Sequence, residues 1–165
     1  MVGEITGESI KSAIALKLKS SFANTNGSPP ITIYKEQIVQ GFKKPSFFIW
    51  IMDVSQEKLL GNKYERLYQM NIRYHPEEKD LKTYETLAEI GNQILEVLTY
   101  IEVPINLGRK DTLGNPIEDK KPVMGKQMSF KIIDGVLQVY VNYVIRGKFK
   151  ELEKPHMQSL EINEK

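Results

Sequence analysis

Residues 123–146 read VMGKQMSFKIIDGVLQVYVNYVIR, and this stretch decides the fold. Asp134-Gly135 at its centre predicts a two-residue turn, because glycine tolerates the positive φ that such a turn needs. Pairing Ile133 with Val136 then gives a single register that places eight apolar side chains on one face and polar ones on the other. The apolar pairs are Ile132 with Leu137, Phe130 with Val139, Met128 with Val141, and Met124 with Ile145. The pattern predicts a long β-hairpin with one buried face.

Two further strands precede this hairpin and differ in their burial. Residues 46–54 carry apolar side chains on both faces: Phe47, Ile49 and Ile51 on one, and Phe48, Trp50 and Met52 on the other. Such a strand is covered on both sides, so we expect this domain's helices on one side and a neighbouring subunit on the other. After a turn at residues 55–63, residues 64–74 alternate as a half-buried antiparallel strand, and residues 31–34 predict a short additional strand.

Two amphipathic helices complete the pattern. In residues 8–23, apolar side chains recur every four positions from Ile10 to Phe22. Residues 80–101 carry a second apolar stripe, with Asp80 as the expected N-cap and Gly91 as a point of close packing on the sheet. The order of elements predicts an α+β domain, with a largely antiparallel sheet and two main helices packed on one face.

The remaining segments set the domain boundaries. Residues 103–122 are rich in Pro, Gly and charge, and predict a long loop, with short strand pieces possible near residues 103–107. We expect residues 107–121 of this loop to project from the body and to contact a partner. Residues 1–149 then form a single domain, and residues 150–165 form a polar C-terminal tail.

Composition and motifs argue against catalysis. The chain has 165 residues, a net charge of +2 and no cysteine, so disulfides and Cys-based zinc sites are excluded. It contains neither of the glycine-rich phosphate-binding motifs. His75 and His156 are expected on the surface, too isolated for a catalytic triad or a metal site. We therefore expect no enzymatic activity, no cofactor and no metal.

The chain also lacks the marks of export or membrane insertion. Its first ten residues do not resemble a signal peptide. Its longest apolar run, residues 47–52, is too short to span a bilayer. We therefore expect a soluble protein without a membrane partner.

One aromatic set allows two interpretations. Tyr64, Tyr68 and Tyr74 share a strand face with Arg66, and such a face can stack the bases of single-stranded nucleic acid. The alternative is a core that also contributes to an interface, and this interpretation is favoured. Basic residues are not clustered as in a dedicated nucleic-acid-binding protein.

Several stretches together resemble a known family. Residues 34–76 contain GFKKPSFFI at the entry to the buried strand, LLGNKY at the turn and YHP at the end of the aromatic strand. The helix LAEIGNQILEVLTYI and the hairpin GKQMSFKIIDGVLQVYVNY follow in the same order. This pattern, over about residues 10–146, resembles the tail terminator family of contractile-tailed phages and defective prophages of Gram-positive bacteria.

The resemblance implies a structural, non-enzymatic role. It implies a ring, usually six-fold, at the head-proximal end of the tail tube, which stops tube growth, anchors the last sheath layer and, in a phage, meets the neck. The implied partners are other copies of the chain, the tube protein, the sheath protein and a neck protein, with DNA only as cargo through the lumen. Assembly is expected in the bacterial host cytoplasm. Two alternatives stay open: another neck or head–tail joining subunit, and a small nucleic-acid-binding module.

Ten residues are the candidates for interfaces in such an assembly. They come from the strand entry, the doubly apolar strand, the aromatic strand and the mixed-charge loop. They are Phe42, Lys43, Lys44, Trp50, Arg66, Arg109, Lys110, Asp111, Lys120 and Lys121.

Overall fold

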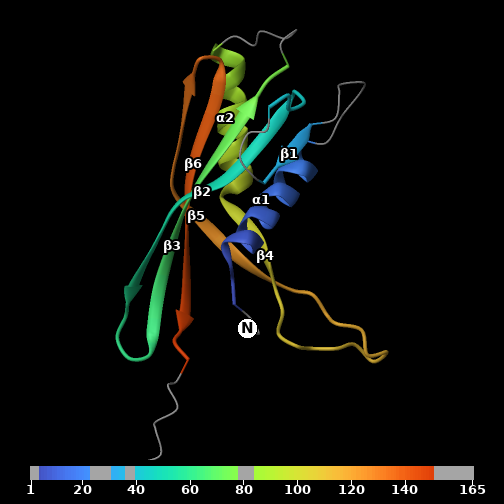
Figure 1. The fold of residues 1–165 in the computed structure, drawn as a ribbon, viewed down its shortest axis with the longest axis vertical. Helices are drawn as coiled ribbons and strands as arrows, with labels where there is room; N and C mark the ends of the chain where they lie inside the picture. The colour runs from blue at the N-terminus through green and yellow to red at the C-terminus, as the bar shows by residue number, and fades with distance from the viewer. Residues whose placement is uncertain (1–3, 23–30, 36–39, 78–83, 151–165) are drawn as a thin grey trace, which may run out of the picture.

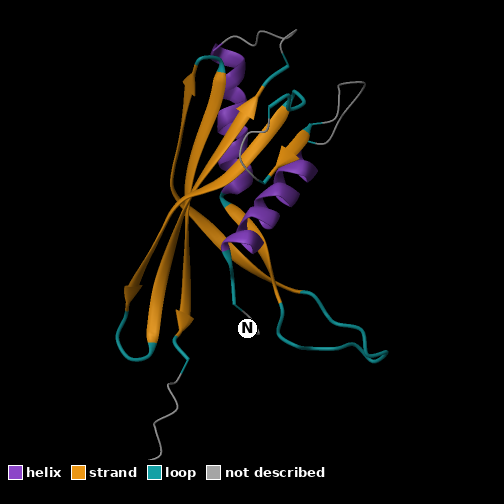
Figure 2. Ribbon diagram, viewed as in Figure 1, coloured by secondary structure: helices purple, strands orange, loops and turns teal. Residues whose placement is uncertain are grey.

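The computed structural model describes residues 4–22, 31–35, 40–77 and 84–150. Six strands form one sheet in the order β1-β2-β3-β6-β5-β4, and only the β1–β2 pair is parallel. Two helices pack on the same face of this sheet (Figures 1 and 2). The predicted α+β class and the largely antiparallel sheet are confirmed. In chain order the elements are α1 (Gly7–Ser21), β1 (Thr32–Tyr34), β2 (Ser46–Lys58), β3 (Lys63–His75), α2 (Tyr84–Leu98), β4 (Tyr100–Ile105), β5 (Asp119–Ile133) and β6 (Val136–Lys148).

Helix α1 begins at a capping box. Ser9 N donates to Thr6 Oγ1 at 3.2 Å, and Thr6 N donates to Ser9 Oγ at 2.8 Å, so two free amides of the first turn are satisfied. In the predicted apolar stripe of this helix, Ile10, Ile14 and Leu18 are fully buried, and Phe22 at its end is partly buried.

Helix α2 packs closely on the sheet through a glycine, as predicted. A Cβ on Gly91 would lie 2.9 Å from two ring atoms of Phe130 in β5. The predicted C-terminal end of this helix is wrong, because α2 stops at Leu98 and Ile101 is buried in β4 instead. Asp80, the expected N-cap, lies outside the described residues.

The predicted hairpin forms, but its register holds only near the turn. Ile133 pairs with Val136, Ile132 with Leu137 and Phe130 with Val139, as expected. A bulge between Lys126 and Ser129 then shifts the register by one residue, with Gln127 at a φ of 49°. The predicted pairing of Met128 with Val141 and of Met124 with Ile145 is therefore wrong.

The bulge has a clear packing cause at Gly125. A Cβ there would lie 2.9 Å from both the Leu98 carbonyl oxygen and Val141 Cγ2, and Gly125 N donates to Thr99 O at 2.8 Å. The strand thus touches the end of α2, and the added residue turns Met124 outward, where it is 50% exposed. Met128 still packs against the core.

Two predicted loops are shorter in the structure. Strand β2 continues to Lys58, so the turn predicted at residues 55–63 is reduced to residues 59–62. The loop predicted at residues 103–122 loses both ends to β4 and β5 and spans residues 106–118.

The sheet divides at one end into two projections (Figure 1). One, here called the limb, is formed by residues 53–68 of β2 and β3 with the end of β6. The other, here called the arm, is residues 106–118 between β4 and β5. The helices cover the opposite half of the sheet (Figure 2), so the limb and the arm stand away from the main core.

Candidate assembly surfaces

An aromatic cluster covers the start of β2 on the face away from the helices. Phe48 stacks on Tyr34, with 4.8 Å between ring centroids, and meets Phe42 edge-on at 5.0 Å. His75 lies against both phenylalanine rings, 4.9 Å from Phe42 and 5.3 Å from Phe48. Phe48 is fully buried by these contacts. The expectation that a neighbouring subunit covers this face is therefore wrong at Phe48, because the chain covers it itself.

His75 is half-buried in this cluster and not on the open surface as expected. Burial lowers its pKa, and the positive charges of Lys44 and Arg73 lower it further. Its Nε2 and the hydroxyl of Ser46, its partner on the next strand, are buried without a hydrogen-bond partner in the part of the chain that the structure describes. The cluster therefore favours a neutral imidazole.

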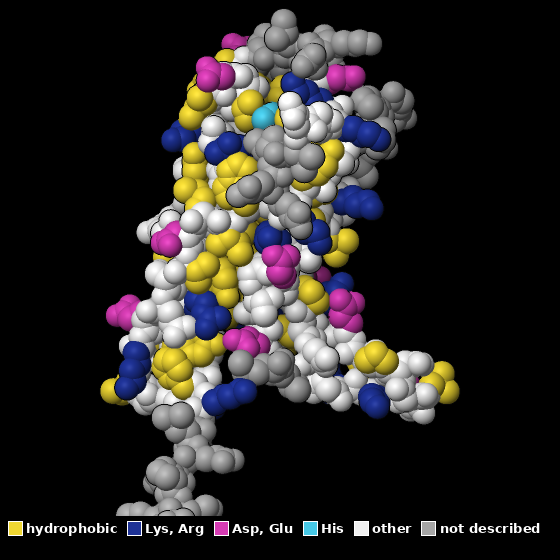
Figure 3. All heavy atoms as spheres, viewed as in Figure 1, with side chains coloured by type: hydrophobic (Ala, Val, Ile, Leu, Met, Phe, Trp, Pro, Cys, Tyr) yellow, Lys and Arg dark blue, Asp and Glu magenta, His cyan; other side chains and the backbone are white. Residues whose placement is uncertain are grey.

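Lys43 and Lys44, which precede β2, contact the aromatic cluster. Lys43 N donates to the hydroxyl of Tyr34 at 3.1 Å, and Lys44 Nζ lies 5.7 Å from the centre of the Phe42 ring. Trp50, further along β2, is half-buried, with the Arg73 guanidinium carbon 4.1 Å from its ring centre. Figure 3 shows Lys and Arg side chains distributed over this view of the molecule, with apolar side chains between them. Beyond Trp50, Met52 is 52% exposed, so β2 leaves apolar surface free where its cluster ends.

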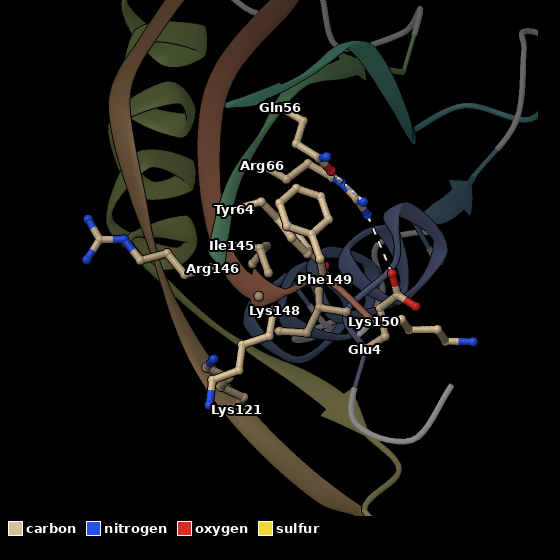
Figure 4. Close-up of a pocket in the computed structure, with 12 residues that line it drawn as sticks. Glu4, Gln56, Tyr64, Arg66, Lys121, Ile145, Arg146, Lys148, Phe149 and Lys150 are labelled. Atoms are coloured by element: carbon tan, nitrogen blue, oxygen red, sulfur yellow. Dashed lines mark hydrogen bonds and ion pairs between the residues drawn. The ribbon is translucent and has the colours of Figure 1, made fainter. Parts of the chain in front are cut away.

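A basic groove lies along the limb, beside the N-terminal segment. It has a volume of about 390 Å³ and is lined by residues of β2, β3, β5 and β6 together with the N-terminal segment (Figure 4). It is lined by five basic residues and one acidic residue, Glu4, but the Arg146 side chain points away from the others (Figure 4) and pairs with Glu65. The cationic residues are Arg66, Lys121, Arg146, Lys148 and Lys150.

Arg66 is the best-fixed of these cations. Its Nε and Nη2 donate to Gln56 Oε1 at 3.0 and 2.7 Å, and its guanidinium lies 5.0 Å from the centre of the Tyr64 ring. Glu4 Oε1 is 3.7 Å from Nη1, as the dashed line in Figure 4 marks. A side chain held by three groups presents its charge in one place.

The floor of the groove depends on Gly147. A Cβ there would lie 2.5 Å from Tyr64 Cζ, so only glycine lets the tyrosine ring lie across the opposing strand. Phe149 then packs against Tyr64, with 5.1 Å between centroids. Asn62 fixes Phe149 from the turn of the limb, because Phe149 N donates to Asn62 O and Asn62 Nδ2 donates to Phe149 O.

The arm is an ordered ribbon and not a structureless loop. Asp111 Oδ1 accepts hydrogen bonds from the backbone N–H groups of Leu113 and Asn115, each at 2.8 Å, and hydrogen bonds from Asn115 lower the pKa of this carboxyl. At the base of the arm the Arg109 guanidinium pairs with the Asp119 carboxylate. The hydrogen bonds to Asp111 and the Arg109–Asp119 ion pair therefore hold a segment that has no hydrophobic core of its own.

The tip of the arm exposes apolar side chains. Leu113 is 85% exposed, and Leu107 and Ile117 are also exposed along the ribbon. In Figure 3, apolar side chains stand at the far end of the arm beside Lys and Arg side chains. The tip of the arm is thus an exposed apolar point on an ordered projection.

The ten candidate residues fall into these three surfaces. Phe42, Lys43, Lys44 and Trp50 lie in or beside the aromatic cluster on β2. Arg66 and Lys121 line the groove. Arg109, Lys110, Asp111 and Lys120 lie on the arm or on the strand beside it. The structure thus brings Arg66 and Lys121 together but keeps the three groups apart. Sequence reasoning missed Tyr34, Arg73, Arg146 and Lys148, which reach these surfaces only through strand pairing.

Other kinds of site find less support. Tyr64, Tyr68 and Tyr74 are all buried in the sheet, so they do not offer a face for stacking bases. Within the described residues, no three His, Asp or Glu side chains are grouped as metal ligands. Neither described helix has the length and apolar character needed to cross a membrane.

The fold is a small α+β domain from which an arm and a limb project beyond the core. A sequence profile of the family described as phage tail terminator protein matches residues 9–155, which is most of the chain, and the chain belongs to this family. It is therefore a structural component of a phage tail. No curated protein sequence matches the chain.

Proposed function

We propose that the chain forms a closed ring, a hexamer, on the head-proximal end of the tail tube. Family membership supports the position in the tail, and the resemblance described above supports the number six. A ring arises when a head-to-tail contact repeats with a rotation that closes. The arm, the groove and the aromatic cluster are distinct, separated surfaces, as a head-to-tail contact with further partners requires.

The ring ends tube growth by occupancy. Once bound, it covers the surface to which the next ring of tube protein would add, and it offers no equivalent surface above. The same ring anchors the last layer of a contractile sheath, or joins the neck, while DNA passes through its lumen only as cargo. This role needs no catalytic residue, cofactor or metal, and assembly takes place in the host cytoplasm before the subunit enters the particle.

The single observation that carries this proposal, beyond the family, is the arm. Its residues are all exposed, yet Asp111 and the Arg109–Asp119 pair hold it in one conformation. Holding the exposed arm in an ordered conformation costs conformational entropy, and burial within the subunit does not offset this cost. Burial of Leu113 by a partner would offset this entropy cost on assembly.

Removal of the gene tests the role directly. Tails should then be of uncontrolled length, or carry a sheath that detaches at the head-proximal end, when particles are imaged by electron microscopy. A plasmid copy of the gene should restore normal particles. Tails of normal length with a firmly attached sheath reject the terminator role and favour the alternative of a neck subunit. Native mass measurement of the protein with its tube protein then counts the subunits in the ring.

A further inference from the structure

Strand β2 has an unpaired edge along most of its length. Strand β1 pairs only with Ser46, Phe47 and Phe48, whereas β2 continues to Lys58. On its other side β2 pairs with β3 down to the turn. Among the described residues, no strand pairs with the outer edge of residues 53–58, and all six of their side chains are exposed.

The hydrogen-bond pattern identifies which backbone groups this edge offers. Leu59 N donates to Lys63 O at 2.9 Å, and antiparallel strands alternate between bonded and non-bonded pairs. Counting back from Leu59 along the regular part of the ladder, Val54, Gln56 and Lys58 turn their N–H and C=O groups away from β3. Three donors and three acceptors therefore lie in a row, in the spacing that one added strand satisfies.

The side chains beside this edge indicate which charge a matching added strand should carry. Asp53 and Glu57 lie on the same face, and neither has an ion-pair partner among the described residues. Glu65, opposite Glu57, is already paired with Arg146 at 2.8 Å. A strand with Lys or Arg on that face, four residues apart, matches both free carboxylates.

The opposite edge of the sheet is not complementary. Gly125 N donates to Thr99 O, so by the same alternation Tyr100, Glu102 and Pro104 of β4 point outward. Pro104 has no N–H to donate, and proline is typical of edges that do not pair. The β4 edge of a second copy therefore matches the three outward positions of the β2 edge incompletely, which favours a strand from another protein.

We propose that residues 53–58 of β2 accept an extended strand from a different protein of the particle, with basic side chains facing Asp53 and Glu57. The inference rests on the proposed function only in taking that protein to be a component of the tail. Addition of a strand to a sheet edge obtains its affinity from main-chain hydrogen bonds and its specificity from alternate side chains.

Proline substitution at the two edges gives a matched test. Val54→Pro removes one outward N–H that has no partner strand among the described residues, at a φ that a strand edge accepts. Glu102→Pro removes an equivalent outward N–H at the opposite edge. Both variants should stay folded by circular dichroism. Val54→Pro should fail to enter particles, as measured by immunoblot of purified tails, whereas Glu102→Pro and Val54→Thr should enter normally. A folded Val54→Pro that enters particles normally overturns the proposal.

Hydrogen exchange of the unaltered protein covers the case in which Val54→Pro does not fold. The amides of Val54, Gln56 and Lys58 should exchange more slowly in purified particles than in the free subunit, by more than about tenfold. Unchanged exchange at these amides overturns the proposal. Slowing that already appears in the purified subunit, and grows with its concentration, assigns the strand to a second copy and also overturns it.

Two outcomes separate this inference from the proposed function. Normal tails in the absence of the gene reject the terminator role, while exchange in particles that contain the subunit still decides whether the β2 edge is paired. Conversely, uncontrolled tail length with an unprotected β2 edge keeps the terminator role and rejects the added strand. The double variant Asp53→Lys, Glu57→Lys tests the charge requirement. It should fail to enter particles, and its melting temperature should be unchanged.

Discussion

Shortening the arm should separate folding from assembly. We consider a variant in which residues 106–118 are replaced by Asn-Gly, so that Ile105 connects to Asp119 through a two-residue turn. These two residues are already opposite each other in the β4–β5 pair, so the new turn closes the existing hairpin. The variant should fold normally and fail to support tail assembly.

The expected change in stability follows from the burial of the arm. All thirteen replaced residues are exposed, so no core contact is lost. Loss of the partly exposed Arg109–Asp119 ion pair costs about 0–1 kcal/mol. Loop closure returns up to about 1.6 kcal/mol, because shortening the loop from thirteen residues to two is nearly three halvings, each worth about 0.6 kcal/mol for a flexible loop, and an ordered ribbon returns less. The net change therefore lies between a loss of about 1 kcal/mol and a gain of about 1.6 kcal/mol, so the melting temperature should fall by no more than about 2–4 °C for a chain of this size.

Two measurements check the prediction together. Thermal unfolding followed by circular dichroism gives the melting temperature of the purified variant. Electron microscopy of particles from a host that lacks the natural gene and expresses the variant shows whether tails terminate. Thr112→Ala keeps the arm and its turn and serves as the matched control, which should behave as the natural protein in both assays.

Either of two results would refute the reasoning. A fall in melting temperature of more than about 6 °C would mean that the arm supports the fold, despite its exposure. Normal tails from a stable variant would mean that the arm contacts nothing essential, and the entropy argument for a partner at Leu113 would fail.

Two further predictions concern the body of the domain. Gly91→Ala should lower stability by up to about 2 kcal/mol, because overlap with the Phe130 ring costs about 1–3 kcal/mol and the gain in helix propensity returns about 1 kcal/mol. Denaturant unfolding measures this, and Phe130→Leu in the same chain should recover most of the loss. For His75, the lowered pKa means that the unfolded chain binds more protons, so stability should fall as pH drops below about 6.5. His75→Phe should flatten that dependence, and an unchanged pH profile of the melting temperature would contradict the assignment.

The sequence predicts the fold well where a local pattern decides it. The Asp134-Gly135 turn fixes the pairs beside it, and the stripe of α1 identifies its buried face. The bulge before Ser129 is not predictable in this way, since apolar residues at both Val123 and Met124 allow either register. What selects Val123 for the core is the close contact of Gly125 with the end of α2, and that contact is tertiary.

The candidate surfaces are less visible in the sequence than the core. Residues 55–58 are polar on both faces, so they carry no strand periodicity, and backbone pairing with β3 alone extends β2 through them. Arg66 and Arg146 line one groove because β3 pairs with β6 across a long stretch of chain. Alternation along one strand identifies a buried face, but it does not say which strand lies beside it.

The separation of core and projections has a consequence for every variant of this protein. The large buried side chains lie where the helices cover the sheet, whereas the arm and the edge of the limb are exposed and are held by local hydrogen bonds and ion pairs. Substitutions at Leu113 or Asp53 therefore remove little burial and should leave unfolding unchanged, while substitutions at Tyr143, whose buried hydroxyl donates to Leu98 O at 2.8 Å, should change unfolding first. A variant that melts normally and fails to assemble thus identifies a contact with a partner.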